Sequence, residues 1–215
     1  MIHFHIISLF PESIEPYLKA SIIGRAVAAK KIKISYYDPK KFTRDKYGRV
    51  DRRPYGGGPG MVLEPDGVLR AAQKALRRAQ GKATEKIFFA TDGALFDESM
   101  AKRLAKKKDI LFICGHYEGV DARVQKILKA KKVSVGPYVL TGGELPAATL
   151  IDAISRFVPG VLGKAESLEA SRVSSPDVYT RPEVLEWKGK KHRVPRVLLS
   201  GHHAKIEEWK KGRRK

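Results

Sequence analysis

The chain has 215 residues, with 43 lysines and arginines against 23 aspartates and glutamates and a formal net charge of +20. This length accommodates one large domain with a real core, or one domain with a small appendage, and the single cysteine excludes an intrachain disulfide. The charge would make a compact monomer repel itself unless a polyanion or a partner offsets it, which favours nucleic acid over a membrane surface or lysines that only aid solubility.

The apolar start of the chain, residues 1–10, has neither a basic leading segment nor a small-residue cleavage site, so it predicts a first strand and not a signal peptide. No stretch approaches the length of a membrane span, and we therefore expect a soluble protein with no membrane partner. Cys114 follows an apolar run at 110–113, which predicts a buried structural thiol and suits a reducing cytoplasm.

Short apolar runs alternate with helical patterns along the chain. Such alternation predicts an α/β fold with a mainly parallel sheet. Asp97 has the residue type and position of an N-cap for the second helix. The expected strands are 2–9, 32–37, 87–90, 110–114 and, more weakly, 133–135, and the expected helices are 65–78, 97–107 and 122–128.

A further helix is predicted by apolar residues at three- and four-residue spacing, and Pro159-Gly160 ends it. The stretch 164–177 is polar and rich in serine, which is typical of a linker. We therefore expect a main domain at 1–160, a flexible linker at 161–178 and a small, basic, helical region at 179–215. The residues that define the buried helical face are Leu145, Ala148, Ile151, Ile154 and Val158.

Three glycine-containing stretches are candidate binding loops. The first, 52–61, fits neither a Walker loop nor a dinucleotide fingerprint, and its flanking arginines favour a phosphate neighbour over a plain connector. The second, 115–121, is a strand-to-helix turn of the kind that binds ligands at a sheet's carboxyl edge, although Tyr117 and Glu118 could equally be a packing residue and a helix-start carboxylate. The third, 134–146, could read an adenine edge through its main chain or could merely connect.

Asp152 and Arg156 are separated by four residues on the last predicted helix of the main domain. Such a spacing is typical of a surface ion pair. Arg156 also lies just before Pro159-Gly160, where it could instead present its guanidinium to a substrate oxygen.

Eight segments, in order over nearly the whole chain, resemble the bacterial tRNA (guanine-N1)-methyltransferases. They are FPE at 10–12, FTRD at 42–45, RPYGGGPGM at 53–61, YEGVD at 117–121, LTGGELP at 140–146, SRFVPGVLG at 155–163, YTRP at 179–182 and VLLSG at 197–201. The resemblance implies an α/β domain of the SPOUT superfamily with a deep trefoil knot, plus a small helical C-terminal domain that is shortened here. It also implies a homodimer.

The same resemblance implies S-adenosylmethionine as methyl donor and the anticodon stem-loop of tRNA as partner, with methylation of the guanine immediately 3′ of the anticodon, position 37. It further implies a requirement for Mg²⁺, for which the sequence offers no ligand set. Carried over residue by residue, the donor site consists mostly of main-chain contacts. Its residues are Phe89, Ala90, Thr91, Gly115, Tyr117, Gly119, Ser134, Val135, Gly136, Tyr138, Leu140, Gly142 and Gly143.

Transfer to N1 of guanine requires a base, because N1 carries a proton at neutral pH, and a donor for the charge that moves onto O6. Arg156 matches the family's arginine. The family's catalytic aspartate has no counterpart, because alanine follows Glu169 where the aspartate is expected. Glu169 is the best substitute, ahead of Asp177 and Glu166.

Glu118, Gly57 and Gly58 are the expected contacts to the target base. The alternative to an active enzyme is a tRNA-binding SPOUT protein whose catalysis is weakened or lost with the aspartate. The basic C-terminus, 210–215, could replace part of the family's longer tRNA-binding domain through phosphate contacts.

Overall fold

The computed structural model describes residues 1–79, 84–162 and 177–212. It divides into two compact units, Met1–Gly163 and Lys164–Lys215. The linker expected at 161–178 lies mostly outside the described residues, so the predicted domain boundaries stay a prediction. Within the described residues, no helix has the length and apolar character needed to cross a membrane.

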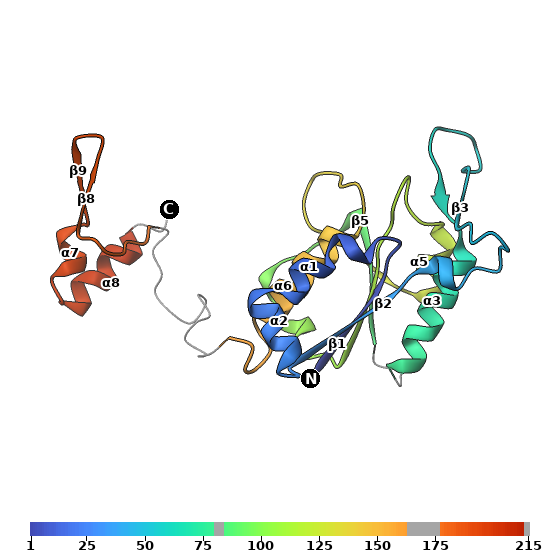
Figure 1. Ribbon diagram of the computed structural model, residues 1–215, viewed down its shortest axis with the longest axis horizontal. Helices are drawn as coiled ribbons and strands as arrows, with labels where there is room; N and C mark the ends of the chain where they lie inside the picture. The colour runs from blue at the N-terminus through green and yellow to red at the C-terminus, as the bar shows by residue number, and fades with distance from the viewer. Residues whose placement is uncertain (80–83, 163–176, 213–215) are drawn as a thin grey trace. The chain divides into compact units, whose positions relative to one another are not determined.

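A five-stranded sheet forms the centre of the first unit, in the order β2-β1-β6-β5-β7. Every neighbouring pair is parallel, which confirms the predicted α/β class (Figure 1). All five predicted strands exist. Their bounds are β1 Ile2–Ile7, β2 Ile32–Tyr37, β5 Glu85–Leu95, β6 Asp109–Ile113 and β7 Lys131–Ser134.

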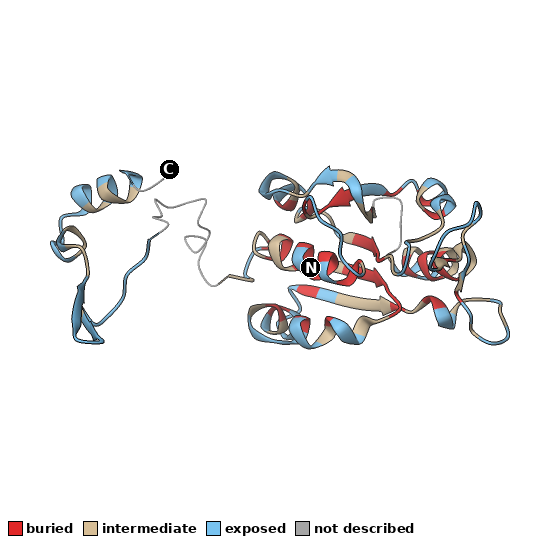
Figure 2. Cartoon of the chain, turned by 90° about the horizontal axis from the view of Figure 1, so that it is seen from above, coloured by how far each residue is buried: buried red, intermediate tan, exposed pale blue. Residues whose placement is uncertain are grey.

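Helices cover both faces of this sheet, each over its own apolar cluster, because alternate residues of every strand point to opposite faces. One cluster packs the sheet against α6 (Glu144–Ser155), α1 (Glu15–Lys19), α2 (Ser21–Ala28) and α4 (Glu98–Leu104). The other packs it against α3 (Pro65–Arg78) and α5 (Ala122–Leu128). The strands are accordingly the most buried layer, as Figure 2 shows.

The long helices agree with the patterns that predicted them. Helices α3 and α5 have the predicted bounds, and α4 begins after Asp97, whose carboxylate accepts a hydrogen bond from Met100 N at 2.7 Å. The pairs α1–α2 and β3–β4 (Asp51–Arg52 and Val62–Leu63) carried no pattern that predicted them. The glycine-rich stretch 52–61 is the connection between β3 and β4.

Strand β5 is interrupted where it pairs with β7. Phe89 and Ala94 both face Val133 in the register, so residues 90–93 leave the ladder and form a loop within the strand. At the end of this loop a Cβ on Gly93 would lie 2.5 Å from Val133 N. Only glycine permits that close approach of the two backbones, which is what returns the chain to β7 after the loop.

The second unit contains a hairpin of β8 (Val184–Trp187) and β9 (Lys190–Arg193), followed by α7 (Arg196–Leu199) and α8 (His203–Gly212). The predicted final helix containing Ile206 is confirmed as α8. The hairpin is an addition to the expected helical region. Tyr179 packs edge-on against Trp209, with ring centroids 6.2 Å apart.

Candidate active site

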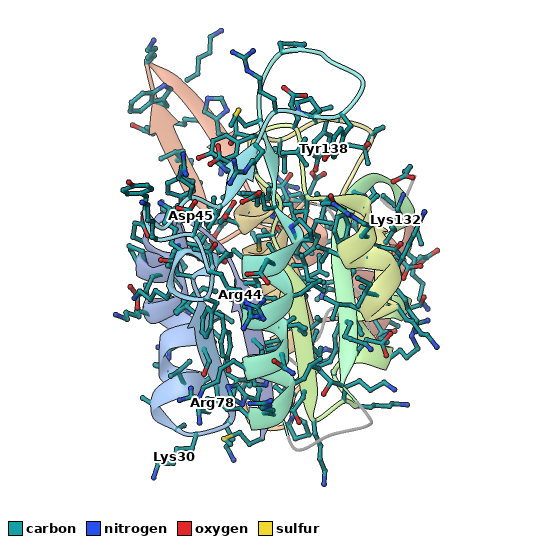
Figure 3. All side chains as sticks on the ribbon, turned by 90° about the vertical axis from the view of Figure 1, so that its right-hand side faces the viewer. Lys30, Arg44, Asp45, Arg78, Lys132 and Tyr138 are labelled. Atoms are coloured by element: carbon teal, nitrogen blue, oxygen red, sulfur yellow. The ribbon has the colours of Figure 1, made fainter. Side chains whose placement is uncertain are left out.

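A cavity of about 340 Å³ opens at the carboxyl edge of the sheet. Three loops enclose it, namely the 90–93 loop of β5, the turn 115–120 after β6 and the loop 134–143 after β7. Neighbouring parallel strands deliver their following loops to the same edge, which is why stretches far apart in sequence meet here. Figure 3 shows Tyr138 at this end of the sheet and Arg78 at the opposite end.

The turn after β6 is held by backbone hydrogen bonds to the segment before α3. Glu118 N donates to Met61 O at 2.9 Å, and Leu63 N donates to Gly119 O at 2.9 Å. Tyr117 has a φ of 58°, in the left-handed region that few non-glycine residues adopt. The turn therefore has a fixed, strained shape that leaves both Tyr117 and Glu118 exposed at the cavity.

The loop after β7 closes on itself and on the turn. Ser134 Oγ lies 3.0 Å from Gly136 O and 3.2 Å from Gly136 N, which tightens the start of the loop. The Tyr138 ring crosses so close to Gly136 that a Cβ there would lie 2.2 Å from it. Further on, Gly143 N donates to Gly115 O at 2.8 Å, which joins the two loops.

Two glycines at the end of this loop are required by close approach. A Cβ on Gly142 would lie 2.4 Å from Glu144 Oε2 and 2.9 Å from His116 Nδ1. A Cβ on Gly143 would lie 2.6 Å from Cys114 Cα. The cavity wall is therefore built largely of backbone, so its amides and carbonyls are available to a ligand.

Below the cavity, Glu144 and Cys114 are both buried. The Glu144 carboxylate accepts a hydrogen bond of 2.6 Å from Ser8 Oγ, which partners this buried charge. Burial raises the pKa of the Cys114 thiol well above its usual range, and the charge of Glu144 adds to the effect. The thiol stays protonated at neutral pH, which excludes it as a nucleophile and agrees with the predicted structural role.

All of the residues expected to bind the methyl donor line this cavity, together with Glu118. Gly57 and Gly58 are exposed in the β3–β4 connection and have φ values of 82° and 113°, but they are not part of the cavity lining. The neighbouring Gly60 does approach it, because a Cβ there would lie 2.6 Å from Glu118 Cγ.

The expected catalytic residues are not brought to this cavity within one chain. Arg156 is the C-cap of α6, about 18 Å along the helix from Glu144 at the cavity end. The segment after it runs to the opposite edge, where a Cβ on Gly160 would lie 3.1 Å from Lys31 Cε. Asp152, on the same helix, accepts a short hydrogen bond from the Tyr17 hydroxyl.

Of the carboxylates considered as the base, Glu169 and Glu166 lie outside the described residues. Asp177 is exposed and belongs to the second unit. The positions of these groups relative to the cavity therefore stay a prediction.

The cavity also contains residues that the sequence did not single out. Thr141 and Val139 adjoin predicted residues in the same loop, and this adjacency was a usable signal. Asp92 gave no such signal, because its place in the cavity depends on the loop within β5. Its carboxylate lies 2.6 Å from Lys132 Nζ, and the hydrogen bond from Lys132 lowers the pKa of that carboxyl.

The parallel sheet and the backbone-lined cavity over its carboxyl edge define an α/β enzyme that binds a small polar ligand between loops. The family model described as tRNA (Guanine-1)-methyltransferase TrmD matches residues 2–215. The chain belongs to this family.

Individual relatives agree with the family match. A Clostridioides difficile protein named tRNA (guanine-N(1)-)-methyltransferase is 41% identical over 212 residues, covering 97% of this chain and 90% of the relative. A Haemophilus influenzae protein of the same name is 43% identical over 209 residues, covering 95% of this chain and 83% of the relative. The match extends over both units and is not confined to the cavity loops.

Proposed function

We propose that this chain transfers a methyl group from S-adenosylmethionine to N1 of a guanine in tRNA. The observation that carries the proposal is the cavity itself, because three separate loops of the family pattern converge there on a backbone-lined space of about 340 Å³. That volume lies within the range of about 300–1,000 Å³ typical of small-molecule sites. The alternative of a tRNA-binding protein without turnover is not favoured, since the family match covers residues 2–215.

The cavity fits the donor by the type of its walls. The adenine and the amino-acid end of the donor offer polar edges that main-chain amides and carbonyls can pair with, and close-packed glycines such as Gly142 and Gly143 present those groups. When bound, S-adenosylmethionine supplies an electrophilic methyl group on a sulfonium. The residues of the chain need only hold it and exclude water, so side-chain differences such as Ala90 and Thr91 are compatible with binding.

Arg156 is proposed to stabilise the charge that develops on guanine O6, and Glu169 to remove the N1 proton. Because Arg156 lies about 18 Å along α6 from the cavity end of that helix, its own side chain does not span the distance. A homodimer removes this difficulty, since a two-fold interface lets one chain's Arg156 serve the partner's cavity. We therefore propose a homodimer with composite active sites.

The remaining expectations are part of the same proposal. The target is the guanine at position 37, whose base is accessible in the single-stranded anticodon loop. Glu118, with the nearby Gly57 and Gly58, is proposed to contact that base at the mouth of the cavity. A cytoplasmic location, a requirement for Mg²⁺ and the deep trefoil knot complete the proposal, and the small second unit is proposed to contact tRNA phosphates through its lysines and arginines.

The donor site is tested by calorimetric titration of the purified chain with S-adenosylmethionine. Gly142→Val is expected to abolish binding, because a Cβ alone would lie 2.4 Å from Glu144 Oε2. Gly212→Val is the matched control, because no atom lies within 4 Å of the corresponding Cβ. Unchanged donor affinity in Gly142→Val would refute the assignment of the cavity.

The composite site is tested by mixing two inactive variants. Arg156→Ala and Gly142→Val are each expected to lack methyl transfer as homodimers. After unfolding and refolding together, their heterodimers contain one cavity and one arginine in working combination, so partial activity is expected. No recovery from the mixture, with heterodimers verified by mass, would contradict a composite site.

The base is assigned by comparing isosteric variants. Glu169→Gln is expected to lose methyl transfer while it retains binding of donor and tRNA. Asp177→Asn serves as the matched control and is expected to remain active. The reverse pattern would transfer the role to Asp177.

A further inference from the structure

Two histidines of β1 lie on one face of the sheet, at the edge opposite the donor cavity. His3 and His5 are separated by one residue, so both point to the same side, and their ring centroids lie 3.8 Å apart. Asp109 is the first residue of β6 and pairs with His3 in the register. Its Oδ1 lies 3.0 Å from His5 Nε2 and 3.8 Å from His3 Nδ1. We refer to His3, His5 and Asp109 as the amino-edge cluster.

Each histidine directs one ring nitrogen to Asp109 and the other to a hydroxyl group. His3 Nε2 lies 2.9 Å from Ser35 Oγ, and His5 Nδ1 lies 3.0 Å from the Tyr37 hydroxyl. This is the arrangement of metal-binding histidines, whose second nitrogen is held by an outer hydrogen-bond partner that fixes the ring. The two hydroxyls from β2 thus orient both imidazoles toward one common point beside Asp109.

Burial keeps the imidazoles of the cluster neutral. The pKa of His3 is lowered to about 4, first by burial and then by the proximity of His5, and burial likewise lowers the pKa of His5. A neutral imidazole has a free lone pair for a metal ion. Solvent still reaches the cluster, because the side chains of His3 and Asp109 are 12% and 20% exposed, whereas that of His5 is inaccessible.

We propose that the amino-edge cluster binds a divalent first-row transition-metal ion of the zinc class. The ligands are His3 Nδ1, His5 Nε2 and Asp109 Oδ1, which lie within 4.8 Å of one another. Two imidazoles and one carboxylate with a fourth position open to water form a typical zinc ligand set, whereas Mg²⁺ prefers oxygen ligands. Among the residues that the structure describes, no other group of three histidine, cysteine or acidic side chains converges in this way.

Binding requires one rearrangement of protons. In the absence of metal, His5 Nε2 donates to Asp109 and Nδ1 accepts from the Tyr37 hydroxyl. With metal on Nε2, the imidazole remains neutral with its proton on Nδ1, which then donates to the Tyr37 oxygen as the hydroxyl rotates. Lys33 and Arg78 also face the histidines and their positive charge opposes a cation, so the site is expected to be weaker than a buried structural zinc site.

The site is tested with Co²⁺, which reports four-coordinate geometry through its visible ligand-field absorption. The full chain, prepared without a histidine tag and stripped with EDTA, is titrated with Co²⁺ and then with Zn²⁺. We expect one Co²⁺ per chain, displacement by Zn²⁺ and no displacement by a large excess of Mg²⁺. Absence of the absorption band, or its removal by Mg²⁺, would overturn the proposal and leave the cluster as a hydrogen-bond network only.

Variants separate this site from adventitious binding. His3→Gln and Asp109→Asn are expected to lose the band, and Ser35→Ala is expected to weaken Co²⁺ binding by about 10- to 100-fold through the outer hydrogen bond. The matched control is the double variant His202→Asn, His203→Asn, which removes two adjacent histidines of the second unit and is expected to keep the band. Loss in the control and retention in Asp109→Asn would overturn the assignment. Circular dichroism and donor binding verify that each variant folds.

Discussion

Replacement of Gly93 by alanine tests how the loop within β5 shapes the donor cavity. The added Cβ would lie 2.5 Å from Val133 N and 2.6 Å from Lys132 C, whereas ordinary van der Waals contacts begin at 3.4 Å. Both neighbours are backbone atoms of β7, so no side chain can rotate away and the two strands must separate. Overpacking of this kind costs about 1–3 kcal/mol.

That cost corresponds to a decrease in Tm of roughly 2–12 °C for a chain of this size. Ser134 and Val135 follow directly in β7 and line the cavity, so the affinity for S-adenosylmethionine is expected to fall by about tenfold, or 1.4 kcal/mol. Differential scanning fluorimetry and calorimetric titration measure the two effects. Asp92→Ala is the matched control in the same loop, because its exposed ion pair with Lys132 contributes at most about 1 kcal/mol.

An alanine at position 93 that left both Tm and donor affinity unchanged would refute this reasoning. It would mean that β7 can move away from β5 without disturbing the loop that follows it. A loss of Tm without a loss of affinity would separate the packing of the strands from the shape of the cavity.

Three further predictions concern stability and reactivity. The Cys114 thiol is expected to resist alkylation by iodoacetamide at pH 8 in the folded protein and to react fully in guanidinium, since burial raises its pKa; rapid labelling without denaturant, followed by mass spectrometry, would contradict this. Asp97→Ala should lower the free energy of unfolding in urea by about 1 kcal/mol through loss of the N-cap bond to Met100, and an unchanged midpoint would count against it. In EDTA, the folded state should lose up to about 3 kcal/mol between pH 6.5 and pH 4, because His3 has a folded pKa of about 4 and the unfolded chain binds its proton first as pH falls; His3→Asn should flatten this dependence, and an equal slope in the variant would disprove it.

The sequence predicted the elements whose signal is local. The apolar runs of β1 and β6 and the helical spacing in α3 and α5 depend on burial of one face or both, which composition reveals directly. Helices α1 and α2 were missed because each is short and Ser21, with a φ of 49°, separates them. The β8–β9 hairpin is composed largely of exposed charged residues and carries no apolar alternation.

The donor loops were identified by family resemblance and their geometry by the structure. Spacing alone indicated ordered turns at a sheet edge, but the contact between Gly143 and Gly115 joins residues that no local pattern connects. The same holds for Asp92, which reaches the cavity only because four residues leave the β5 ladder. The distance of Arg156 from the cavity likewise depends on the direction of α6, which a spacing argument does not contain.

The amino-edge cluster shows the same limit more sharply. His3 and His5 lie in an otherwise apolar strand, and Asp109 is more than a hundred positions away in the sequence. Their proximity follows from the pairing of β1 with β6, a long-range feature of the sheet order. The residue types alone indicated no site there.

The most direct test of the proposed function is identification of the methylated product. An anticodon stem-loop with guanine at position 37, preceded by guanine, is incubated with the purified chain and S-adenosylmethionine, digested to nucleosides and analysed by mass spectrometry against standards. The account predicts 1-methylguanosine from this RNA and none from the same RNA with adenine at position 37. A methyl group on any other nucleoside or ring atom, or no transfer although donor and RNA both bind, would contradict it.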